Sequence, residues 1–292
     1  MKQTKEITAL FKLIDDPDDL VFDTVSEKII RFGKDIIPHL ENLWEHAADE
    51  ILQERIEHLI HRVQFEDLQK DIFEWSHSKR PELLKGAILI ARYQFSELNV
   101  PALLAQFDII RRNIWLELNN YLTPLEQINV LNSILYNYYK IEGQELTKRE
   151  AKHFFINQVL ESKQGNNYAI GILYLALCEM LDIPVFAMNI PRQFVFAYID
   201  TLHHFFTSDY DQQQIQFFVD PLNGMVYTQT DVNAYLKKIN CEILPEYFTP
   251  LPAKTIIYKM MEELAICYQY NNEEEKAAEI KILMKILEPH LA

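Results

Sequence analysis

The sequence predicts a mainly helical α+β protein with a short antiparallel sheet between about residues 182 and 228, and three observations support this class. Apolar residues make up 49% of the 292 residues and aromatic residues 12%, as in a globular chain with a large core. Only six glycines stand against 15 tyrosines and 17 phenylalanines, which favours helices joined by few tight turns. Helical spacing of apolar residues runs through most of the chain, whereas alternating spacing is confined to one segment.

Residues 1–65 are predicted to form paired amphipathic helices. A turn is expected at residues 15–18, a helix end near Gly33, and new helices after Pro38 and from about Glu50. This alternation of helix and turn resembles a HEAT-type repeat, the two-helix unit of some solenoid proteins. The N-terminal part is therefore expected to be a helical-repeat region.

Three further regions are expected. Residues 66–144 continue as helices packed on a core, and residues 145–248 form that core, with helices at 151–161 and 168–181 before the strands. Residues 249–292 form a helical hairpin that resembles one tetratricopeptide unit. A single unit of this kind cannot bury its own apolar face, so the hairpin must pack on the core.

Composition argues against several classes of partner. The net charge of −15 disfavours binding to a nucleic-acid backbone or to an anionic membrane surface. Three cysteines without a CxxC pair fit a reducing compartment, and neither a signal peptide nor an apolar run of about 18 residues stands out. We expect a cytoplasmic protein that needs no cofactor and no metal ion.

The segment "MNIPRQFVFAYID" (188–200) is predicted to be a turn followed by a strand. Phe194 and the residues two and four positions further point to one side of the sheet, and the intervening apolar residues to the other. Arg192 and Gln193 precede the strand, which we expect to begin at Gln193. A second strand, in "FFVDPLNG" (217–224), ends at Asp220.

Residues 156–224 resemble the SirB family of bacterial transglutaminase-like proteins. The likeness rests on "N-x-V-L-E" from Asn157, "GN" before an "ILYL" helix, "L-x-IPV", a "P-x-x-F" strand and "F-V-D-P-x-N-G". The helical parts on both sides are similar to that family as well. The resemblance implies a papain-like core, in which a cysteine starts the central helix, a histidine on the next strand takes its proton, and an aspartate orients the histidine.

The resemblance also implies that two of these three catalytic positions have lost their chemistry. Ala169 stands at the start of the helix, where "GNNYAI" replaces the usual "GNPISL" of the family, and neither cysteine nor serine is present. Gln193 stands where the family usually has the histidine of "GHF", and an amide cannot act as a general base. Asp220 remains. We therefore expect a non-catalytic protein that binds a protein or peptide in the former active-site groove.

The groove is expected to be formed by residues from all three degenerate positions, namely Asn167, Tyr168, Arg192, Gln193 and Asp220. One alternative is an enzyme acting on amide bonds (a peptidase, deamidase or acyl transferase), in which Asp220 works with His203 or His204. Another is a purely structural protein whose cleft is filled by Tyr168 and Phe194. Asp220 also has a structural interpretation, because an aspartate before proline can cap its own turn.

Other reactive side chains are interpreted as structural. Cys178 lies among apolar residues of a helix and is expected to be a buried, inert thiol. Cys241 and Cys267 carry no sign of activation. The helix "ERIEHLIHR" (54–62) places glutamates and histidines at spacings that could share a metal ion, but a solvated helix face is the favoured interpretation.

Overall fold

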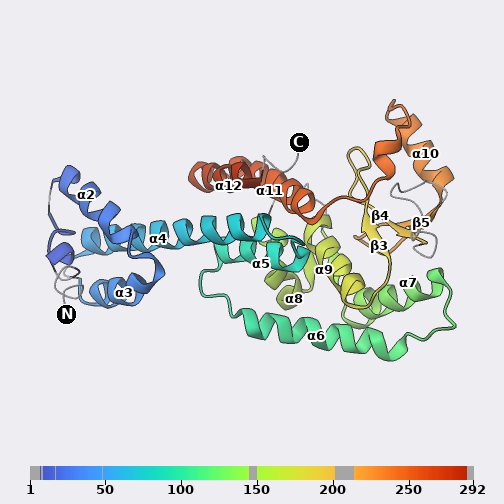
Figure 1. Cartoon of the computed structure of the whole chain (residues 1–292), viewed down its shortest axis with the longest axis horizontal. Coiled ribbons are helices and arrows are strands. Elements are labelled where there is room, and N and C mark those ends of the chain that lie inside the picture. The colour runs from blue at the N-terminus through green and yellow to red at the C-terminus, as the bar shows by residue number, and fades with distance from the viewer. Residues whose placement is uncertain are drawn as a thin grey trace. The chain divides into compact units, whose positions relative to one another are not determined.

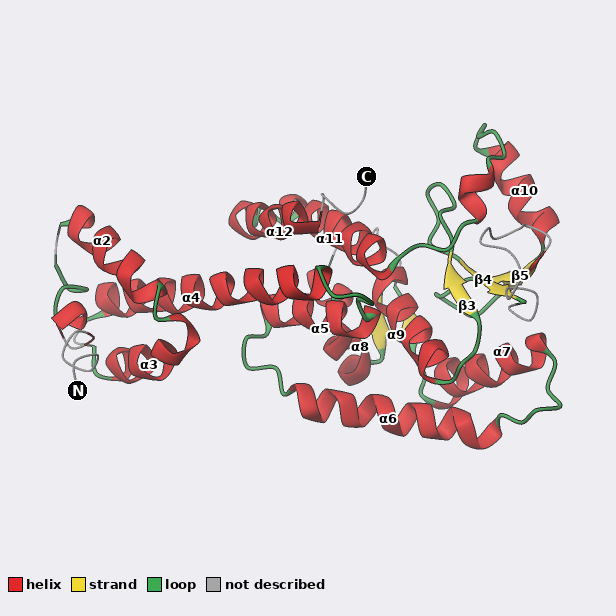
Figure 2. Ribbon diagram, in the orientation of Figure 1, coloured by secondary structure: helices red, strands yellow, loops and turns green. Residues whose placement is uncertain are grey.

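The computed structural model of the chain describes residues 7, 9–16, 18–47, 49–144, 150–200 and 214–287. The chain divides into two compact units, residues 1–74 and residues 75–292 (Figure 1). Helices dominate both units, and all strands within the described ranges lie in the second (Figure 2). The mainly helical α+β class predicted from the sequence is confirmed. Within the same ranges, no helix has both the length and the apolar character needed to cross a bilayer.

The first unit is a set of helices around its own apolar core. Its elements in chain order are α2 (Asp19–Ile30), η1 (Gly33–Ile36), α3 (Ile37–Glu45) and α4 (Glu50–Ser76), of which the last two residues belong to the second unit. Arg55 on α4 donates hydrogen bonds to the carbonyl oxygens of Ile14 and Asp16 at 3.2 and 2.7 Å, which fastens the turn before α2 to α4. The buried core residues are Leu10, Ile14, Val25, Ile29, Ile36, Leu40, Ile56, Leu59 and Val63.

The second unit is centred on one buried helix. Its helical elements are α5 (Leu83–Gln94), α6 (Val100–Glu117), α7 (Pro124–Asn132), the π-helix η2 (Ser133–Tyr138), η4 (Ala151–Phe154), α8 (Ile156–Ser162), α9 (Asn167–Met180), α10 (Gln229–Lys238), η7 (Pro245–Phe248), α11 (Ala253–Tyr270) and α12 (Glu274–Leu287). The central helix is α9, which is buried from Ala169 to Cys178. A helix that is apolar on all sides must be covered on all sides, and α5, α6, α8, α11 and β3 all contact α9.

A four-stranded antiparallel sheet packs against α9. Its strands run in the order β3 (Val185–Ala187), β4 (Phe196–Ile199), β5 (Ile215–Val219) and β6 (Val226–Tyr227), and a separate parallel pair joins β1 (Glu142–Gly143) to β2 (Gln164–Gly165). The alternation predicted for β4 is confirmed, because Phe194 and Phe196 lie against Gly171 of α9. The alternate residues Val195, Ala197 and Ile199 join a cluster with α10.

The C-terminal hairpin α11–α12 packs on the helices of the second unit. Helix α11 contacts both α5 and α9, as an unpaired hairpin requires. Two partly buried hydrogen bonds fasten it: Tyr268 donates to Gln94 Oε1 at 3.0 Å, and Tyr93 donates to Glu279 Oε2 at 2.7 Å. Burial and the adjacent Glu279 together raise the pKa of Tyr93, so its hydroxyl remains a hydrogen-bond donor.

Two boundaries differ from the sequence-based expectation. The helix expected at 151–161 is divided into η4 and α8, because Phe155 adopts an extended conformation between them. The strand expected to begin at Gln193 begins at Phe196 instead. Residues 190–193 form a turn, in which the Gln193 N–H donates to the Ile190 oxygen at 3.2 Å.

Candidate functional site: a polar cleft at the start of α9

In the first turn of α9, side-chain oxygens accept hydrogen bonds from backbone N–H groups. Asn166 is the N-cap and accepts a hydrogen bond from the Ala169 N–H at 2.9 Å, while the Asn167 side chain accepts from the Tyr168 N–H at 3.0 Å. In a cysteine-nucleophile enzyme such donors would face the developing oxyanion. Here Ala169, only 1% exposed, has a methyl group instead of a nucleophile, and its N–H is already bound.

A polar cleft of about 230 Å³ opens beside this turn. Four of the five groove residues expected from the sequence line it together: Asn167, Tyr168, Arg192 and Gln193. The other lining residues come from the β3–β4 connection, from the loop before α11 and from α11 itself: Met188, Asn189, Ile190, Phe194, Leu251, Lys259, Glu262 and Glu263. The fifth expected residue, Asp220, is not part of this lining.

One wall of the cleft is a fixed aromatic pair. Tyr168 stacks on Phe194 with ring centroids 4.7 Å apart and an interplanar angle of 26°. Burial raises the pKa of Tyr168, and the carboxylates of Glu263 and Glu262 raise it further, so the phenol stays protonated. The pair forms a wall of the cleft and leaves the cleft open beside it.

Another part of the lining is a turn in an unusual backbone conformation. Pro191 and Arg192 occupy its two central positions, and Arg192 has φ = +61°. A turn with a positive φ at its third residue prefers glycine there, because a Cβ atom is crowded in that conformation. The Tyr235 hydroxyl of α10 donates to the Pro191 oxygen at 3.0 Å and holds the turn in place. The structure therefore keeps an exposed arginine where glycine would fit more easily.

Charged residues from α11 complete the cleft, and no motif in the sequence indicates that they belong to it. Lys259, Glu262 and Glu263 lie within one helical turn, so they share a face of α11. They stand more than 60 residues after Gln193 in a segment interpreted as a separate hairpin. Their spacing was the only available signal, and it is common on solvated helices. The cleft thus combines two cations, two carboxylates and the side-chain amides of Asn167, Asn189 and Gln193.

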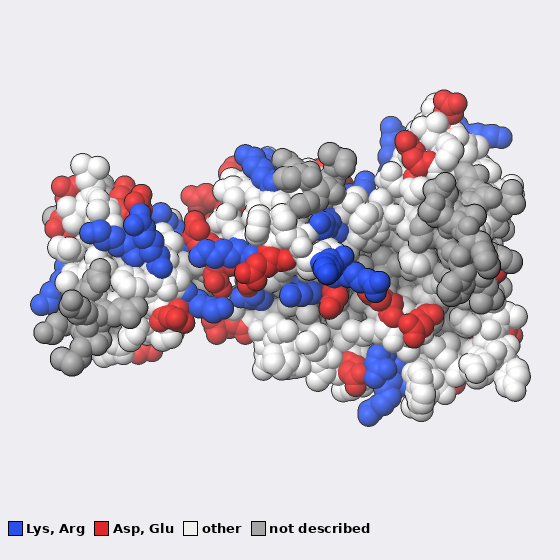
Figure 3. Space-filling view, viewed as in Figure 1, with Lys and Arg blue, Asp and Glu red and all other residues white. Residues whose placement is uncertain are grey.

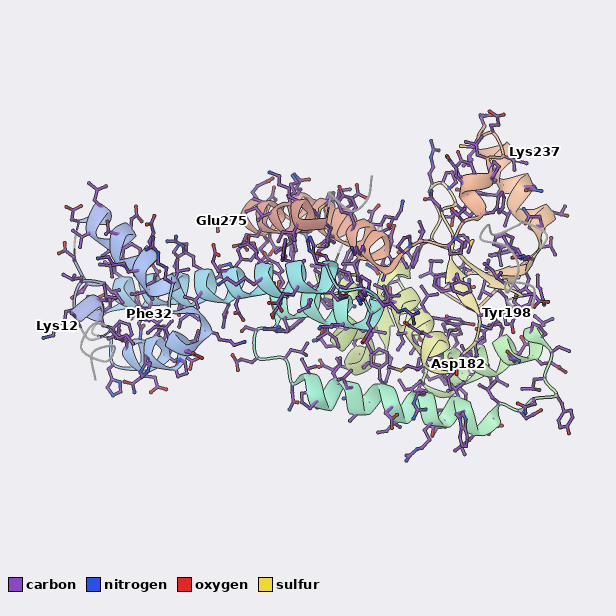
Figure 4. All side chains as sticks on the ribbon, viewed as in Figure 1. Lys12, Phe32, Asp182, Tyr198, Lys237 and Glu275 are labelled. Atoms are coloured by element: carbon purple, nitrogen blue, oxygen red, sulfur yellow. The ribbon has the colours of Figure 1, made fainter. Side chains whose placement is uncertain are left out.

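Asp220 caps the turn that follows β5, as its structural interpretation predicted. Its carboxylate accepts a hydrogen bond from the Leu222 N–H at 2.8 Å, and its backbone oxygen accepts from the Gly224 N–H at 2.8 Å. The turn is also fastened to α7 and η2. Asn132 donates to the Gly224 oxygen at 2.8 Å, and Tyr136 donates to the Pro221 oxygen at 2.7 Å (the sheet and α7 appear in Figure 4).

The remaining candidates do not extend the cleft. Cys178 is fully buried, and burial raises the pKa of its thiol, as expected for an inert cysteine. Cys241 is half-buried and Cys267 buried. His203 and His204, on which the enzymatic alternative depends, lie outside the described residues. No set of three His, Cys, Asp or Glu side chains within the described ranges is arranged to hold a metal ion.

Substitutions of Asp220 test whether this residue acts only as a turn cap or is needed as an ionised carboxylate. Burial raises the pKa of Asp220 in the folded state, although the Leu222 N–H partly opposes the shift. A carboxyl group whose pKa is higher in the folded than in the unfolded state adds to the free energy of unfolding when it is protonated. This stabilisation is complete below the pKa of the unfolded state, about 3.9, and is lost as the pH rises through the pKa of the folded state. Asparagine can accept the same hydrogen bond without ionising. Asp220→Asn is therefore expected to be at least as stable as wild type at pH 7.

Urea unfolding between pH 3.5 and 7 measures this effect. Wild type should lose stability relative to Asp220→Asn as the pH rises through that window. Asp220→Ala, which also loses the hydrogen bond to Leu222, should be less stable by about 1 kcal/mol at pH 7. A severe loss of stability in Asp220→Asn at pH 7 would mean that the ionised carboxylate is itself needed by the fold.

Comparison with known proteins identifies related sequences. The profile of the transglutaminase-like superfamily matches residues 101–262, from α6 into α11. The UPF0162 protein BU173 of Buchnera aphidicola subsp. Acyrthosiphon pisum is 19% identical over 170 residues, which are 57% of this chain and 59% of that protein. The match thus spans little more than half the length of each. No solved structure matches the chain significantly.

Proposed function

The chain belongs to the transglutaminase-like superfamily, and from that premise we propose that it is a non-catalytic binding protein that holds a peptide segment of a partner in the cleft at the start of α9. The observation that carries the proposal is the set of residues at the start of α9 and at the two other positions of the expected triad. Ala169 has no nucleophile, and its N–H donates to Asn166 instead of facing a substrate. Gln193 cannot take a proton, and Asp220 is engaged in its own turn.

The chemistry of the cleft supports a peptide as the ligand. Side-chain amides both donate and accept hydrogen bonds, so Asn167, Asn189 and Gln193 match the alternating N–H and C=O groups of an extended main chain. The flanking lysine, arginine and glutamates suit charged side chains or chain ends of the peptide. The Tyr168–Phe194 wall offers an apolar surface for a side chain.

The backbone at Arg192 supports a binding role for its side chain. Conformations that disfavour a Cβ atom gather at functional sites, where another requirement outweighs their cost. Arg192 is exposed, lines the cleft and has φ = +61°. Its guanidinium, with five donors in a fixed plane, is suited to a peptide carboxylate or carbonyl. We infer that this arginine is the main anchor of the ligand.

The finer assignments are also proposals. We place the chain in the SirB family on the motifs between residues 156 and 224, with a HEAT-like region at 1–65, helices at 66–144, the core at 145–248 and a tetratricopeptide-like hairpin at 249–292. Helical repeats commonly provide extended surfaces for proteins. Free thiols at all three cysteines support a cytoplasmic location. On the face shown in Figure 3, acidic and basic side chains are interspersed, which also favours protein partners over nucleic acid.

Selection from a displayed library of random heptapeptides tests the proposal. The full chain is the bait, and selected peptides are measured for affinity against wild type and two variants. Arg192→Gly removes the guanidinium while relieving the backbone, so its stability should stay within about 1 kcal/mol of wild type. Its peptide affinity should fall roughly 10- to 100-fold, the cost of one charge-assisted hydrogen bond. Lys285→Ala, an exposed change on α12, should bind like wild type.

The same peptides decide between binding and the enzymatic alternative. Mass spectrometry of peptides recovered after long incubation should show unchanged masses. Hydrolysis, deamidation or amine attachment that disappears in Asp220→Asn would instead support an enzyme using Asp220 with His203 or His204. If the library yields no peptide that distinguishes wild type from Arg192→Gly, the cleft is not a peptide site and the structural alternative is favoured.

A further inference from the structure

Helix α6 has a second apolar surface besides the one that it buries. Its buried stripe, Leu103, Phe107, Ile110 and Ile114, faces the second unit. Large apolar side chains elsewhere on the helix remain in solvent: Leu104 is 41% exposed, Ile109 47%, Trp115 61% and Leu116 65%. An exposed tryptophan next to other apolar residues is typical of a protein interface. Figure 1 shows α6 at the margin of the unit.

Four residues of α6, three of them exposed and Arg111 partly buried, form a straight stripe. Leu104, Asp108, Arg111 and Trp115 are separated by four, three and four positions, the spacing at which side chains align along one side of a helix. Within the stripe, both Nε and a terminal nitrogen of Arg111 donate to Asp108 Oδ1, at 2.9 and 2.7 Å. The order is therefore apolar, acidic, basic, apolar.

This order is complementary to itself under two-fold symmetry. If a second α6 lies antiparallel with the symmetry axis between positions 109 and 110, position 104 faces 115 and position 108 faces 111 of the other copy. Leu104 then packs on the indole of Trp115, and Asp108 meets Arg111, twice each. The four charges alternate in sign around the axis, and the apolar pairs close both ends.

We propose that a second copy of this chain docks on α6 through the stripe formed by Leu104, Asp108, Arg111 and Trp115, with the two helices antiparallel. A foreign partner would need complementary groups of its own, whereas this surface already carries its complement. The residues of the stripe do not line the cleft, so the dimer is independent of the proposed peptide binding and leaves the cleft available in each copy.

Charge reversal tests the pairing directly. A dimer of Asp108→Arg would have arginine at all four charged positions, namely 108 and 111 of both copies. A dimer of Arg111→Asp would have aspartate at all four. Each variant alone should therefore be monomeric at concentrations where wild type is dimeric. The double variant Asp108→Arg/Arg111→Asp restores opposite charges and should dimerise again. An equimolar mixture of the two single variants should also dimerise, because every facing pair is then an arginine with an aspartate.

Sedimentation of the full chain over a range of concentrations and salt is the measurement. Trp115→Ala should raise the dimer dissociation constant at least about tenfold, and Glu275→Arg, a charge reversal on exposed α12, should leave it unchanged. A wild type that is monomeric at all concentrations overturns the proposal. So does a dimer insensitive to Trp115→Ala, or single variants that fail to pair on mixing while remaining folded by circular dichroism.

Discussion

Replacing Phe196 by alanine is expected to lower the free energy of unfolding of the second unit by about 3–5 kcal/mol, the usual cost of removing a buried phenylalanine. Phe196 is 0% exposed and lies between the sheet and α9. Its ring is 5.7 Å from that of Tyr174 and 5.3 Å from that of Phe194. Gly171 lets the Phe196 ring approach α9 closely. Neighbouring side chains therefore cannot fill the cavity left by the ring unless α9 moves.

Urea unfolding followed by tryptophan fluorescence and circular dichroism measures this loss. Tyr121→Ala is the matched control, since Tyr121 is 96% exposed and its removal should change stability by less than about 0.5 kcal/mol. A loss below about 1 kcal/mol for Phe196→Ala would show that the sheet is not packed on α9 in the way described.

Gly224→Ala is expected to destabilise the second unit by about 2–4 kcal/mol, the sum of an unfavourable backbone conformation and a steric clash. Gly224 has φ = +72°, and an added Cβ would lie 2.5–2.7 Å from three atoms of the Asn132 side chain. Asn132 cannot turn away freely, because it donates to the Gly224 oxygen at 2.8 Å and accepts from the Tyr174 hydroxyl at 3.1 Å.

Gly33→Ala isolates the backbone part of that cost. Gly33 has φ = +67°, and nothing lies within 4 Å of the position of an added Cβ. Its substitution should therefore cost only about 1–2 kcal/mol. Both losses are read from urea denaturation, each on the transition of its own unit. Equal losses for the two variants would contradict the tight contact between the turn after β5 and α7.

Local sequence patterns predicted the helices and strands that carry the site, but they did not predict which of these elements pack against one another. Alternation along residues 194–199 correctly predicted that successive side chains lie on opposite sides of the sheet, and the structure shows which of the two sets faces α9. The capping role of Asp220 also followed from residues next to it in sequence. The start of β4 was predicted three residues too early, because the turn at 190–193 extends into the apparent strand.

The far wall of the cleft could not be predicted from local pattern. Lys259, Glu262 and Glu263 become part of the site only because α11 folds against α9. Likewise, Asn132 and Tyr136 fasten the turn after β5 from positions about 85–92 residues away. Such contacts depend on tertiary packing, which single-sequence periodicity does not contain. The positive φ of Arg192 was also hidden, since arginine is not a residue that signals that conformation.

The structure separates the fold of this core from the chemistry for which such folds are known to be used. Helix α9, the sheet and the turns that position them are held by buried contacts that require no nucleophile. At the helix start, the Asn166 side chain accepts the hydrogen bond of the Ala169 N–H. The accessible cleft beside this turn combines mixed charge, side-chain amides and an aromatic wall, and these are the groups that the proposed peptide binding would use.

The most direct test of the proposed binding role is an NMR titration of the isotope-labelled full chain with a peptide from the heptapeptide selection. We expect saturable shifts of the backbone amides of Asn167, Tyr168, Arg192 and Gln193. In Arg192→Gly, roughly 10- to 100-fold more peptide should be needed for the shifts at the unchanged positions. The peptide should be recovered chemically unchanged. Shifts confined to residues outside the cleft, or recovery of a cleaved, deamidated or cross-linked peptide, would contradict a non-catalytic peptide site at the start of α9.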